Sequence, residues 1–330
     1  MSGVESSGAL AREIKLRHCL EGVLREKNLP AIVAVDGVRS EHEGSYENQI
    51  LTLRLAGGTQ LKLFLKDFGR SKLPKDAAAD RRERELRVYA ELLEDAELGT
   101  ARFYGAHWDE AAARFWLFLE FVDSEPLWHC GPEHWLEAAA WLGRMHGRFA
   151  GQQSRLRACR FLVRQDATFF FGAAERALEA VSWLSDGLAR RLAGVLEGYD
   201  QIVAVLSREP ETLVHGSYRP QNVLAIRSSD SPRICPTDWE LAAFGRSTHD
   251  LAFLCDHYVD LLDSLFDAYE FGAKSSGFRP RDRDELGREV DCFRLHKTVS
   301  SLGHLRQWPR PAETAAKVVA VAEEIAGTLK

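Results

Sequence analysis

The chain has 330 residues, of which 45% are hydrophobic and 28% are charged, as in an ordinary globular protein large enough for two lobes. A net charge of −6 argues against a nucleic-acid partner. The sequence shows no signal-peptide core and no uncharged apolar run of ~20 residues, which argues against a membrane partner. Six scattered cysteines without a CxxC pair indicate reduced thiols, so we expect a cytoplasmic protein, whose oligomeric state the sequence does not indicate.

Residues 1–122 are predicted to form a small β-rich lobe. Leucine alternates with other residues in 51–55 and 61–65 on either side of a Gly-Gly turn, which predicts an antiparallel hairpin. Period-two alternation places Lys66 on the face opposite those leucines. Residues 1–10 are expected to fray. The other elements predicted in this lobe are helices over 11–27 and 76–95 and strands near 103–107 and 115–122.

Helical segments dominate after residue 122, so residues 123–330 are predicted to form a larger helical lobe. Two short strands, 223–226 and 233–236, interrupt the helices. The expected fold class is therefore α+β with two lobes. The predicted helices are 132–149, one long helix within 174–206, 248–270, 284–305 and 312–329.

The most informative motif is the run His-Gly-Ser-Tyr-Arg-Pro-Gln-Asn at residues 215–222, followed by Asp-Trp-Glu at 238–240. Asn222 offers an amide oxygen and Asp238 a carboxylate, and Mg²⁺ prefers such hard oxygen donors. The two short strands are expected to hold these ligands face to face. Each residue alone is more often a turn cap or a solvated acid, but the order and spacing together favour a metal site.

These residues resemble the pattern of the aminoglycoside phosphotransferase and choline-kinase-like group within the protein-kinase-like superfamily. That pattern is His-Gly-Asp, an Asn five residues after the Asp, Asp-Trp/Phe-Glu, Gly and Asp-Leu-Ala, and this chain departs from it only at Ser217. The resemblance implies a bilobal kinase-like fold, with nucleotide bound by residues 1–122 and the catalytic loop and acceptor pocket in 123–330. It also implies ATP or another nucleoside triphosphate, Mg²⁺ and a small-molecule acceptor.

Further site residues follow from the resemblance alone. Lys66 matches the lysine that contacts the α- and β-phosphates, and Glu85 its helix partner, with Glu83 and Glu91 as alternatives. Asp250 matches the residue that braces the catalytic-loop backbone, which agrees with an N-cap at a helix start. The remaining matches are a phosphate lid in 43–48, with backbone amides at Ser45 and Tyr46, and an adenine-binding hinge at Glu120 to Val122.

Ser217 stands where this family carries the aspartate that receives the acceptor's proton. A serine hydroxyl is not ionised near pH 7, and losing a general base typically costs about 10²–10⁴ in rate. Arg219 is expected to contact the transferring phosphate, and Glu240 is a candidate replacement base. Three hypotheses remain open: an active small-molecule kinase with an atypical base, a pseudokinase that binds nucleotide or a small molecule, and another nucleotide-dependent transferase.

The acceptor pocket is expected among the C-terminal helices. Acidic residues there would draw a cationic substrate, although solvated helix faces are the preferred interpretation. These candidates are Asp256, His257, Asp260, Asp263, Asp267 and Glu270, with Trp128, Trp135 and Trp308 as possible apolar walls.

Overall fold

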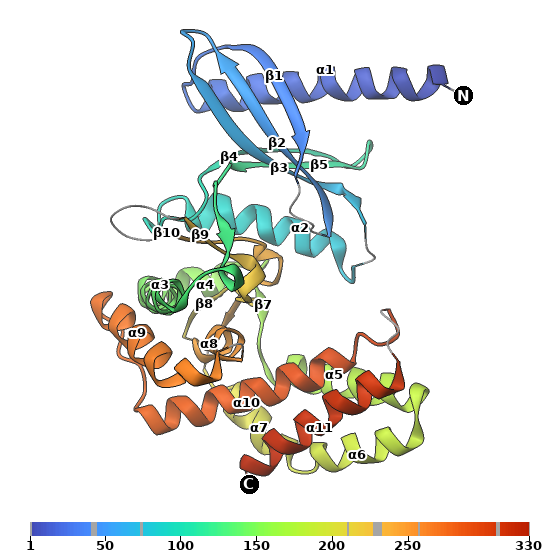
Figure 1. Cartoon of the computed structure of the whole chain (residues 1–330), viewed down its shortest axis with the longest axis vertical. Coiled ribbons are helices and arrows are strands. Elements are labelled where there is room, and N and C mark those ends of the chain that lie inside the picture. The colour runs from blue at the N-terminus through green and yellow to red at the C-terminus, as the bar shows by residue number, and fades with distance from the viewer. Residues whose placement is uncertain are drawn as a thin grey trace. The chain divides into compact units, whose positions relative to one another are not determined.

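The computed structural model describes residues 2–40, 45–72, 75–209, 211–226, 233–256, 258–307 and 311–329. The chain divides into two compact units, Met1–Asp123 and Ser124–Lys330 (Figure 1). The first is built on a β-sheet and the second mainly from helices, which gives the α+β kinase-like fold that was predicted. Within the described ranges, no helix is long and apolar enough to cross a membrane.

A five-stranded antiparallel sheet in the order β1-β2-β3-β5-β4 forms the centre of the first unit (Figure 1). The predicted hairpin is present and longer than expected, with Thr52 opposite Lys62 and Asn48 opposite Lys66. The edge strand β1 was not predicted, because most of its side chains are exposed and give no alternating pattern. The strands are β1 (Ile32–Arg39), β2 (Tyr46–Leu55), β3 (Gln60–Ser71), β4 (Phe103–Asp109) and β5 (Arg114–Glu120).

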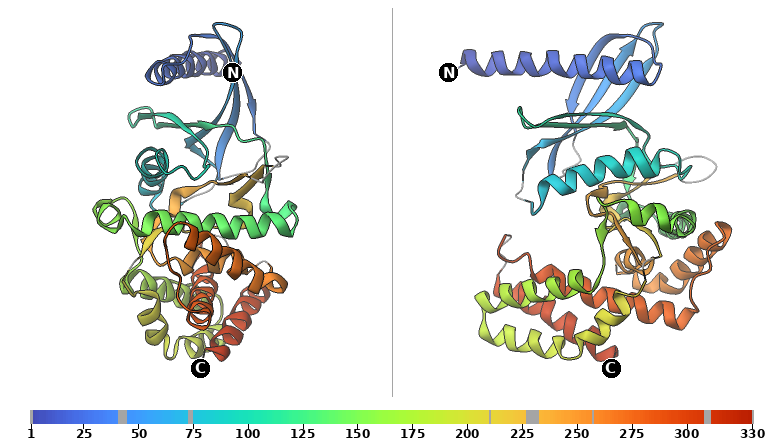
Figure 2. Two further views of the ribbon diagram at one scale, coloured as in Figure 1. Left: turned by 90° about the vertical axis from the view of Figure 1, so that its left-hand side faces the viewer. Right: turned by 180° about the vertical axis from the view of Figure 1, so that it is seen from behind.

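Helix α1 (Ser2–Glu26) covers the leucine face of this sheet (Figure 2). Leu20 and Leu24 of the helix are buried against Leu63 and Leu65 of β3. The prediction that residues 1–10 fray was wrong for the backbone, which is helical from Ser2 onward. Small polar residues at a terminus lower helix propensity only weakly. The helix can extend through them because its other end is packed against the sheet.

The opposite face of the sheet meets α2 (Ala78–Arg87), which continues into the π-helical segment η1 (Val88–Leu93). Together they occupy most of the helix predicted over 76–95. Glu85 of α2 is buried against Lys66 of β3. The first unit is therefore a sheet between two helical layers.

The second unit contains two small sheets, ordered β10-β9-β6 and β7-β11-β8. The predicted pair of strands has the expected bounds and pairs antiparallel, with Cys235 opposite Leu224. This hairpin lies directly after the 215–222 motif and before the 238–240 motif. The strands of the two small sheets are β6 (Glu125–Pro126), β7 (Val163–Arg164), β8 (Thr212–Val214), β9 (Val223–Ile226), β10 (Arg233–Pro236) and β11 (Ala243–Gly245).

Two of the long helices predicted in this unit are broken. The segment 174–206 belongs to three helices, because Ser185 adopts an extended conformation and caps the next helix, while Gly198 has a φ of +81°. The segment 248–270 is divided into α8 and α9, joined through the short η5 (Val259–Leu261). The helices are α3 (Pro132–Ala150), α4 (Gln153–Ala158), α5 (Ala167–Leu184), α6 (Asp186–Leu196), α7 (Tyr199–Leu206), α8 (Thr248–Cys255), α9 (Leu262–Ser275), α10 (Arg283–Leu302) and α11 (Ala312–Thr328).

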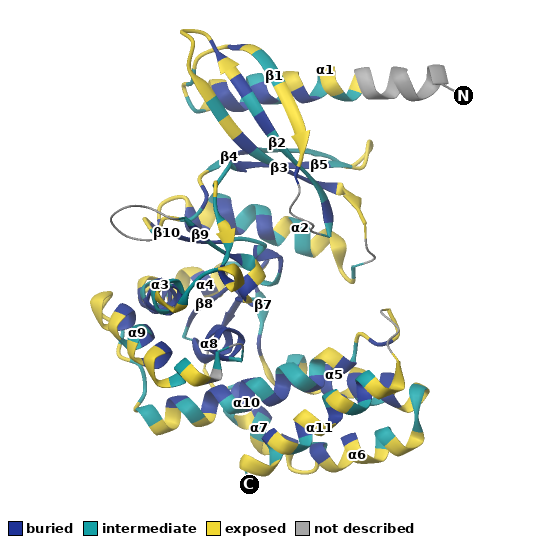
Figure 3. Ribbon diagram, in the orientation of Figure 1, coloured by how far each residue is buried: buried dark blue, intermediate teal, exposed yellow. Residues whose placement is uncertain are grey.

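Helix α8 is the most deeply buried helix near the motif residues (Figure 3). All eight of its residues, from Thr248 to Cys255, are buried. Helices α3 and α9 cross closely at Gly143 and Gly272, where a methyl group on Gly272 would lie 1.9 Å from the Ala140 carbonyl oxygen. These contacts fix the position of the segments that carry the site.

Candidate active site

Lys66 and Glu85 form a buried ion pair in the first unit. The Lys66 Nζ lies 2.9 Å from Glu85 Oε1 and 2.7 Å from Oε2. Both side chains are almost inaccessible to solvent, with side-chain exposures of 9% and 1%. A carboxylate that grips the ammonium through both oxygens fixes a side chain that is otherwise flexible. Neither competing glutamate makes this contact, since Glu83 and Glu91 pair with Arg87.

Aromatic side chains from the start of β2 and from β3 flank the Lys66 ammonium. The Tyr46 and Phe68 ring centroids lie 5.3 Å and 5.2 Å from the Lys66 ammonium. Tyr46 is buried, and the Ser45 carbonyl oxygen accepts a hydrogen bond of 2.8 Å from the Lys72 backbone N–H. The predicted lid also includes Glu43 and Gly44, which lie outside the described residues.

The predicted hinge lies at the end of β5. The Glu120 backbone N–H donates to the Arg102 carbonyl oxygen at 2.8 Å, so this donor is already used within the sheet. The Glu120 carboxylate in turn accepts from the Arg102 backbone N–H at 3.1 Å. Val122 follows the strand and is half-buried.

Asp250 holds the backbone of the predicted catalytic loop, residues 215–222, in the second unit. Its carboxylate accepts hydrogen bonds from the backbone N–H groups of His215 at 2.6 Å and Gly216 at 2.9 Å. The predicted brace is thus confirmed, but Asp250 lies in the first turn of α8 and is not its N-cap. Gly216 has a φ of +81°, and a Cβ there would lie 2.0 Å from the Leu241 carbonyl oxygen, so this turn requires glycine.

Asp250 depends on two histidines that the sequence motif does not include. His146 Nε2 of α3 lies 3.4 Å from one Asp250 oxygen, and His249 Nδ1 lies 3.5 Å from the other. Burial raises the pKa of Asp250, but hydrogen bonds from His146 and His249 overcome it and leave the pKa well below its usual value. His146 precedes Asp250 by 104 residues, so nothing in the sequence pattern could have indicated this contact.

His215 is a structural residue of the loop. Its Nε2 lies 2.9 Å from the Thr237 carbonyl oxygen, and its Nδ1 accepts a hydrogen bond from the Ser217 backbone N–H at 3.2 Å. Burial lowers the pKa of the imidazole, so the neutral form with the proton on Nε2 satisfies both contacts. Because both nitrogens are engaged, His215 has no free nitrogen with which to deprotonate the Ser217 hydroxyl.

Ser217 accepts two hydrogen bonds from the side-chain amide of Asn222. Asn222 Nδ2 donates to the Ser217 carbonyl oxygen at 3.0 Å and to Ser217 Oγ at 3.3 Å. These bonds hold the amide nitrogen of Asn222 toward Ser217, which leaves its oxygen to face away. The serine therefore preserves the orientation of Asn222 without supplying a base.

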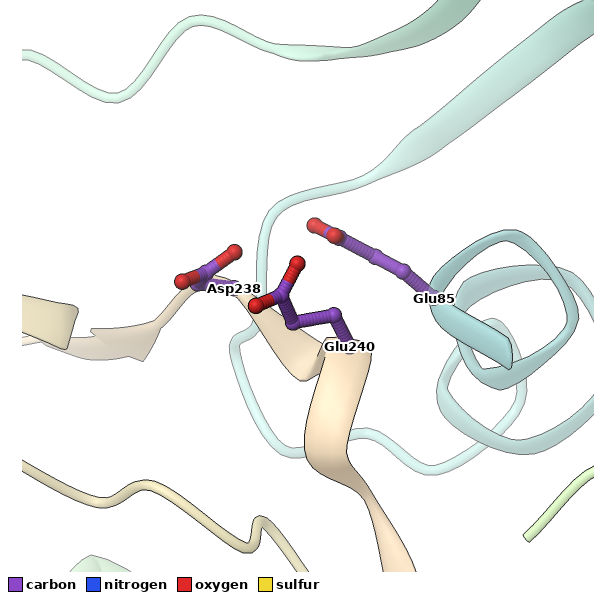
Figure 4. A group of neighbouring side chains, drawn as sticks. All are labelled: Glu85, Asp238 and Glu240. Atoms are coloured by element: carbon purple, nitrogen blue, oxygen red, sulfur yellow. The ribbon is translucent and has the colours of Figure 1, made fainter. Parts of the chain in front are cut away.

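Asp238 and Glu240 come from one turn after β10 (Figure 4). Carboxylate oxygens of the two residues lie within 4.8 Å of each other. Asp238 has a φ of +67°, a conformation that costs energy for a residue with a side chain and that clusters at functional sites. With the Asn222 amide, these carboxylates make a set of hard oxygen donors that suits Mg²⁺. Figure 4 also draws Glu85 on its own helix in the other unit.

Arg219 is exposed at the edge of the loop. Its guanidinium carbon lies 5.2 Å from the centre of the Phe253 ring on α8. The Lys297 ammonium of α10 approaches the same ring at 4.9 Å. Arg219 and Lys297 thus both approach the Phe253 ring, and Arg219 lies two residues after Ser217 in the sequence.

The lobed fold, the braced loop and the paired lysine are features of a kinase-like phosphotransferase. The family model described as phosphotransferase enzyme family matches residues 40–286, and the chain belongs to this family. No curated protein matches the sequence significantly.

Several solved structures share this fold at low sequence identity. Aminoglycoside 2'-phosphotransferase-IIIa in a GDP complex has a TM-score of 0.64 and 15% identity over 95% of this chain and 99% of that chain. Choline kinase from Cryptosporidium parvum Iowa II has a TM-score of 0.59 and 14% identity, covering 94% and 96%. Amicoumacin kinase in complex with AMP-PNP, Ca²⁺ and its ligand has a TM-score of 0.56 and 15% identity, covering 96% of each chain.

Proposed function

We propose that this protein is a Mg²⁺-dependent phosphotransferase that moves the γ-phosphoryl group of ATP, or of another nucleoside triphosphate, to a hydroxyl group of a small molecule. The observation that carries the proposal is the catalytic loop, in which Asp250 fixes the backbone and Ser217 fixes the amide of Asn222. The similar kinases named above act with nucleotides on small molecules, which supports the same class of reaction here.

Each group has a role that its chemistry suits. Lys66, held by Glu85, would neutralise the α- and β-phosphates. The backbone of Glu120 to Val122 would face adenine, and that of Ser45 and Tyr46 would lie over the phosphates. Asn222 and Asp238 would hold Mg²⁺, which supplies charge neutralisation on the phosphates. Arg219 would contact the group in transfer or its acceptor.

The reaction itself needs little covalent help from the protein. The acceptor oxygen forms a bond to the γ-phosphorus, and the bond to the β,γ-bridging oxygen breaks with its electron pair leaving on the nucleoside diphosphate. The acceptor proton must then pass to water or to a carboxylate such as Glu240, because Ser217 does not take it. Positioning and electrostatics carry most of such a reaction, so a missing base slows the reaction without abolishing it.

A pseudokinase is the second candidate. It is favoured by the contacts of the two loop side chains next to Ser217, those of His215 and Asn222. Both are already engaged in hydrogen bonds, and neither can act as a base toward the Ser217 hydroxyl. Such a protein would bind nucleotide or a small molecule as a sensor or scaffold.

Transfer of labelled phosphate from γ-labelled ATP to a library of small-molecule alcohols distinguishes the two candidates. A phosphotransferase gives a labelled product that disappears in Asp238→Asn, whereas a pseudokinase shows Mg²⁺-dependent nucleotide binding without product. If neither ATP nor GTP with Mg²⁺ raises the melting temperature, the phosphotransferase and the nucleotide-binding form of the pseudokinase are both wrong.

A further inference from the structure

The charges beside the catalytic loop indicate which kind of acceptor this site takes. Similar enzymes named above act on compounds such as aminoglycosides and choline, and such cations are recognised by carboxylates. The acidic side chains predicted to attract a cationic acceptor lie at the end of α8, on η5 and on α9. Whether they can do so depends on which cations of the chain already pair with them.

Three of these acids pair with cations of the chain itself. Asp263, Asp267 and Glu270 all lie within 3.5 Å of the Arg283 guanidinium. Glu270 also accepts from Lys274 at 2.8 Å. Asp260 is exposed on η5, and the structure does not describe His257. A cationic acceptor bound by Asp263, Asp267 or Glu270 would have to compete with these internal partners.

Asp256, at the C-terminal end of α8, is shared by two cations. Arg294 Nε lies 2.6 Å from one of its oxygens, and Lys297 forms an ion pair with the other. Arg294 also pairs with Asp291 at 2.8 Å. The carboxylates of Asp256 and Asp291 thus balance the charges of Arg294 and Lys297.

Arg219 adds a positive charge that nothing balances in the described part of the chain. Its contact there is with the ring of Phe253, and it forms no ion pair with a described residue. Lys297 lies against the same ring, half-buried. Burial and, to a smaller extent, the charge of Arg219 lower the pKa of Lys297 to about 8, as expected for two cations that approach the same ring. Two like charges beside one ring are stabilised when an anion joins them.

We infer that Arg219 and Lys297, on either side of Phe253, bind an anionic group of the acceptor, a carboxylate or a phosphate, so that the substrate is a hydroxylated acid rather than an amine. The inference rests on the proposed phosphotransferase function. Arg219 lies two residues after Ser217, so an anion held there places a hydroxyl elsewhere on the same molecule next to the catalytic loop.

Four compounds on one scaffold test this charge preference: glucose, glucosamine, glucuronate and glucose 6-phosphate, with inorganic phosphate as the smallest probe. Binding is measured by calorimetry on protein saturated with AMP-PNP and Mg²⁺, and again without nucleotide. The anionic compounds are expected to bind, and Arg219→Gln and Lys297→Met are each expected to weaken them roughly tenfold to 100-fold. Lys297→Arg should restore binding. Lys317→Met, on the exposed face of α11, is the matched control and should bind like the wild type.

Four results would overturn the inference. The first two are tighter binding of glucosamine than of glucuronate, and no binding of any anion at tens of millimolar. The other two are anion binding in both variants as tight as in the wild type, and displacement of the anion by AMP-PNP. The last result would assign the two cations to nucleotide phosphates. Failure of AMP-PNP to bind the wild type would count against the proposed function alone, because anion binding is also measured without nucleotide.

Discussion

Ser217 separates two tasks that the family resemblance assigns to a single aspartate at this position. Its hydroxyl accepts the hydrogen bond that orients Asn222, which is the structural task. It cannot take a proton near neutral pH, which is the chemical task. The sequence predicts that a base is missing, and the structure adds that Ser217 orients the side-chain amide of Asn222.

Restoring the carboxylate should therefore raise the rate. We expect Ser217→Asp to increase phosphoryl transfer, or slow ATP hydrolysis if no acceptor is found, by about 10²-fold or more, because a general base is regained while the contact to Asn222 is kept. The rate of ADP release measures this. Ser217→Asn is the matched control of similar size without a base, and equal rates in the two variants would show that deprotonation does not limit the reaction.

The Lys66–Glu85 pair is expected to matter for stability as well as for nucleotide binding. Lys66→Met leaves the Glu85 carboxylate buried without its cation and should lower the free energy of unfolding by about 3–5 kcal/mol. The double variant Lys66→Met/Glu85→Met removes both charges and should regain most of that loss. Urea denaturation compares the three proteins. A double variant no more stable than Lys66→Met would exclude the buried carboxylate as the cause.

At the scale of elements, local patterns predicted some segments well and failed where tertiary contacts decide. Strands β9 and β10 have the predicted bounds, because a short apolar run between turn residues has few alternatives. The helix predicted within 174–206 is broken at Ser185 and Gly198, where single residues with special conformations outweigh a continuous apolar pattern. Strand β1 was missed because its exposed edge position produces no periodicity.

The crossing of α3 and α9 gives a prediction at this scale. Gly272→Ala places a methyl group 1.9 Å from the Ala140 carbonyl oxygen, so the helices must separate, and we expect a loss of about 1–3 kcal/mol in unfolding free energy. Gly194→Ala on α6 is the matched control, since a methyl group there meets nothing within 4 Å. It should stabilise the protein by up to about 1 kcal/mol. Denaturant midpoints that fall equally in both variants would contradict the packing argument.

For the whole molecule, the order of motifs along the chain was sufficient to predict the lobed kinase-like fold. Contacts between distant segments could not be predicted, because they depend on how helices pack. The bond from His146 to Asp250 spans 104 residues, and the bond between Tyr199 and His296 spans 97. Buried titratable groups in such contacts make the stability of a protein depend on pH.

Acid should destabilise this protein well above the usual pKa of carboxylates. His296 is buried with its Nδ1 2.9 Å from the Tyr199 hydroxyl, and burial lowers its pKa to about 3. The unfolded chain has a histidine pKa of about 6.5, so between pH 6.5 and 3 it binds a proton that the folded protein does not. Stability therefore falls as pH falls through this window, by up to about 1.4 kcal/mol per pH unit from His296. His215 acts in the same direction, since burial lowers its pKa too.

Urea denaturation at pH 7, 6 and 5 measures this slope. His296→Asn should be less stable than the wild type at pH 7 but should lose less stability between pH 7 and 5, by about 2 kcal/mol for the one histidine removed. Tyr199→Phe removes the same hydrogen bond while it keeps the buried imidazole, so it should be destabilised and retain the wild-type slope. If His296→Asn keeps the wild-type slope and Tyr199→Phe loses it, the acid sensitivity arises from the hydrogen bond and not from protonation of the histidine.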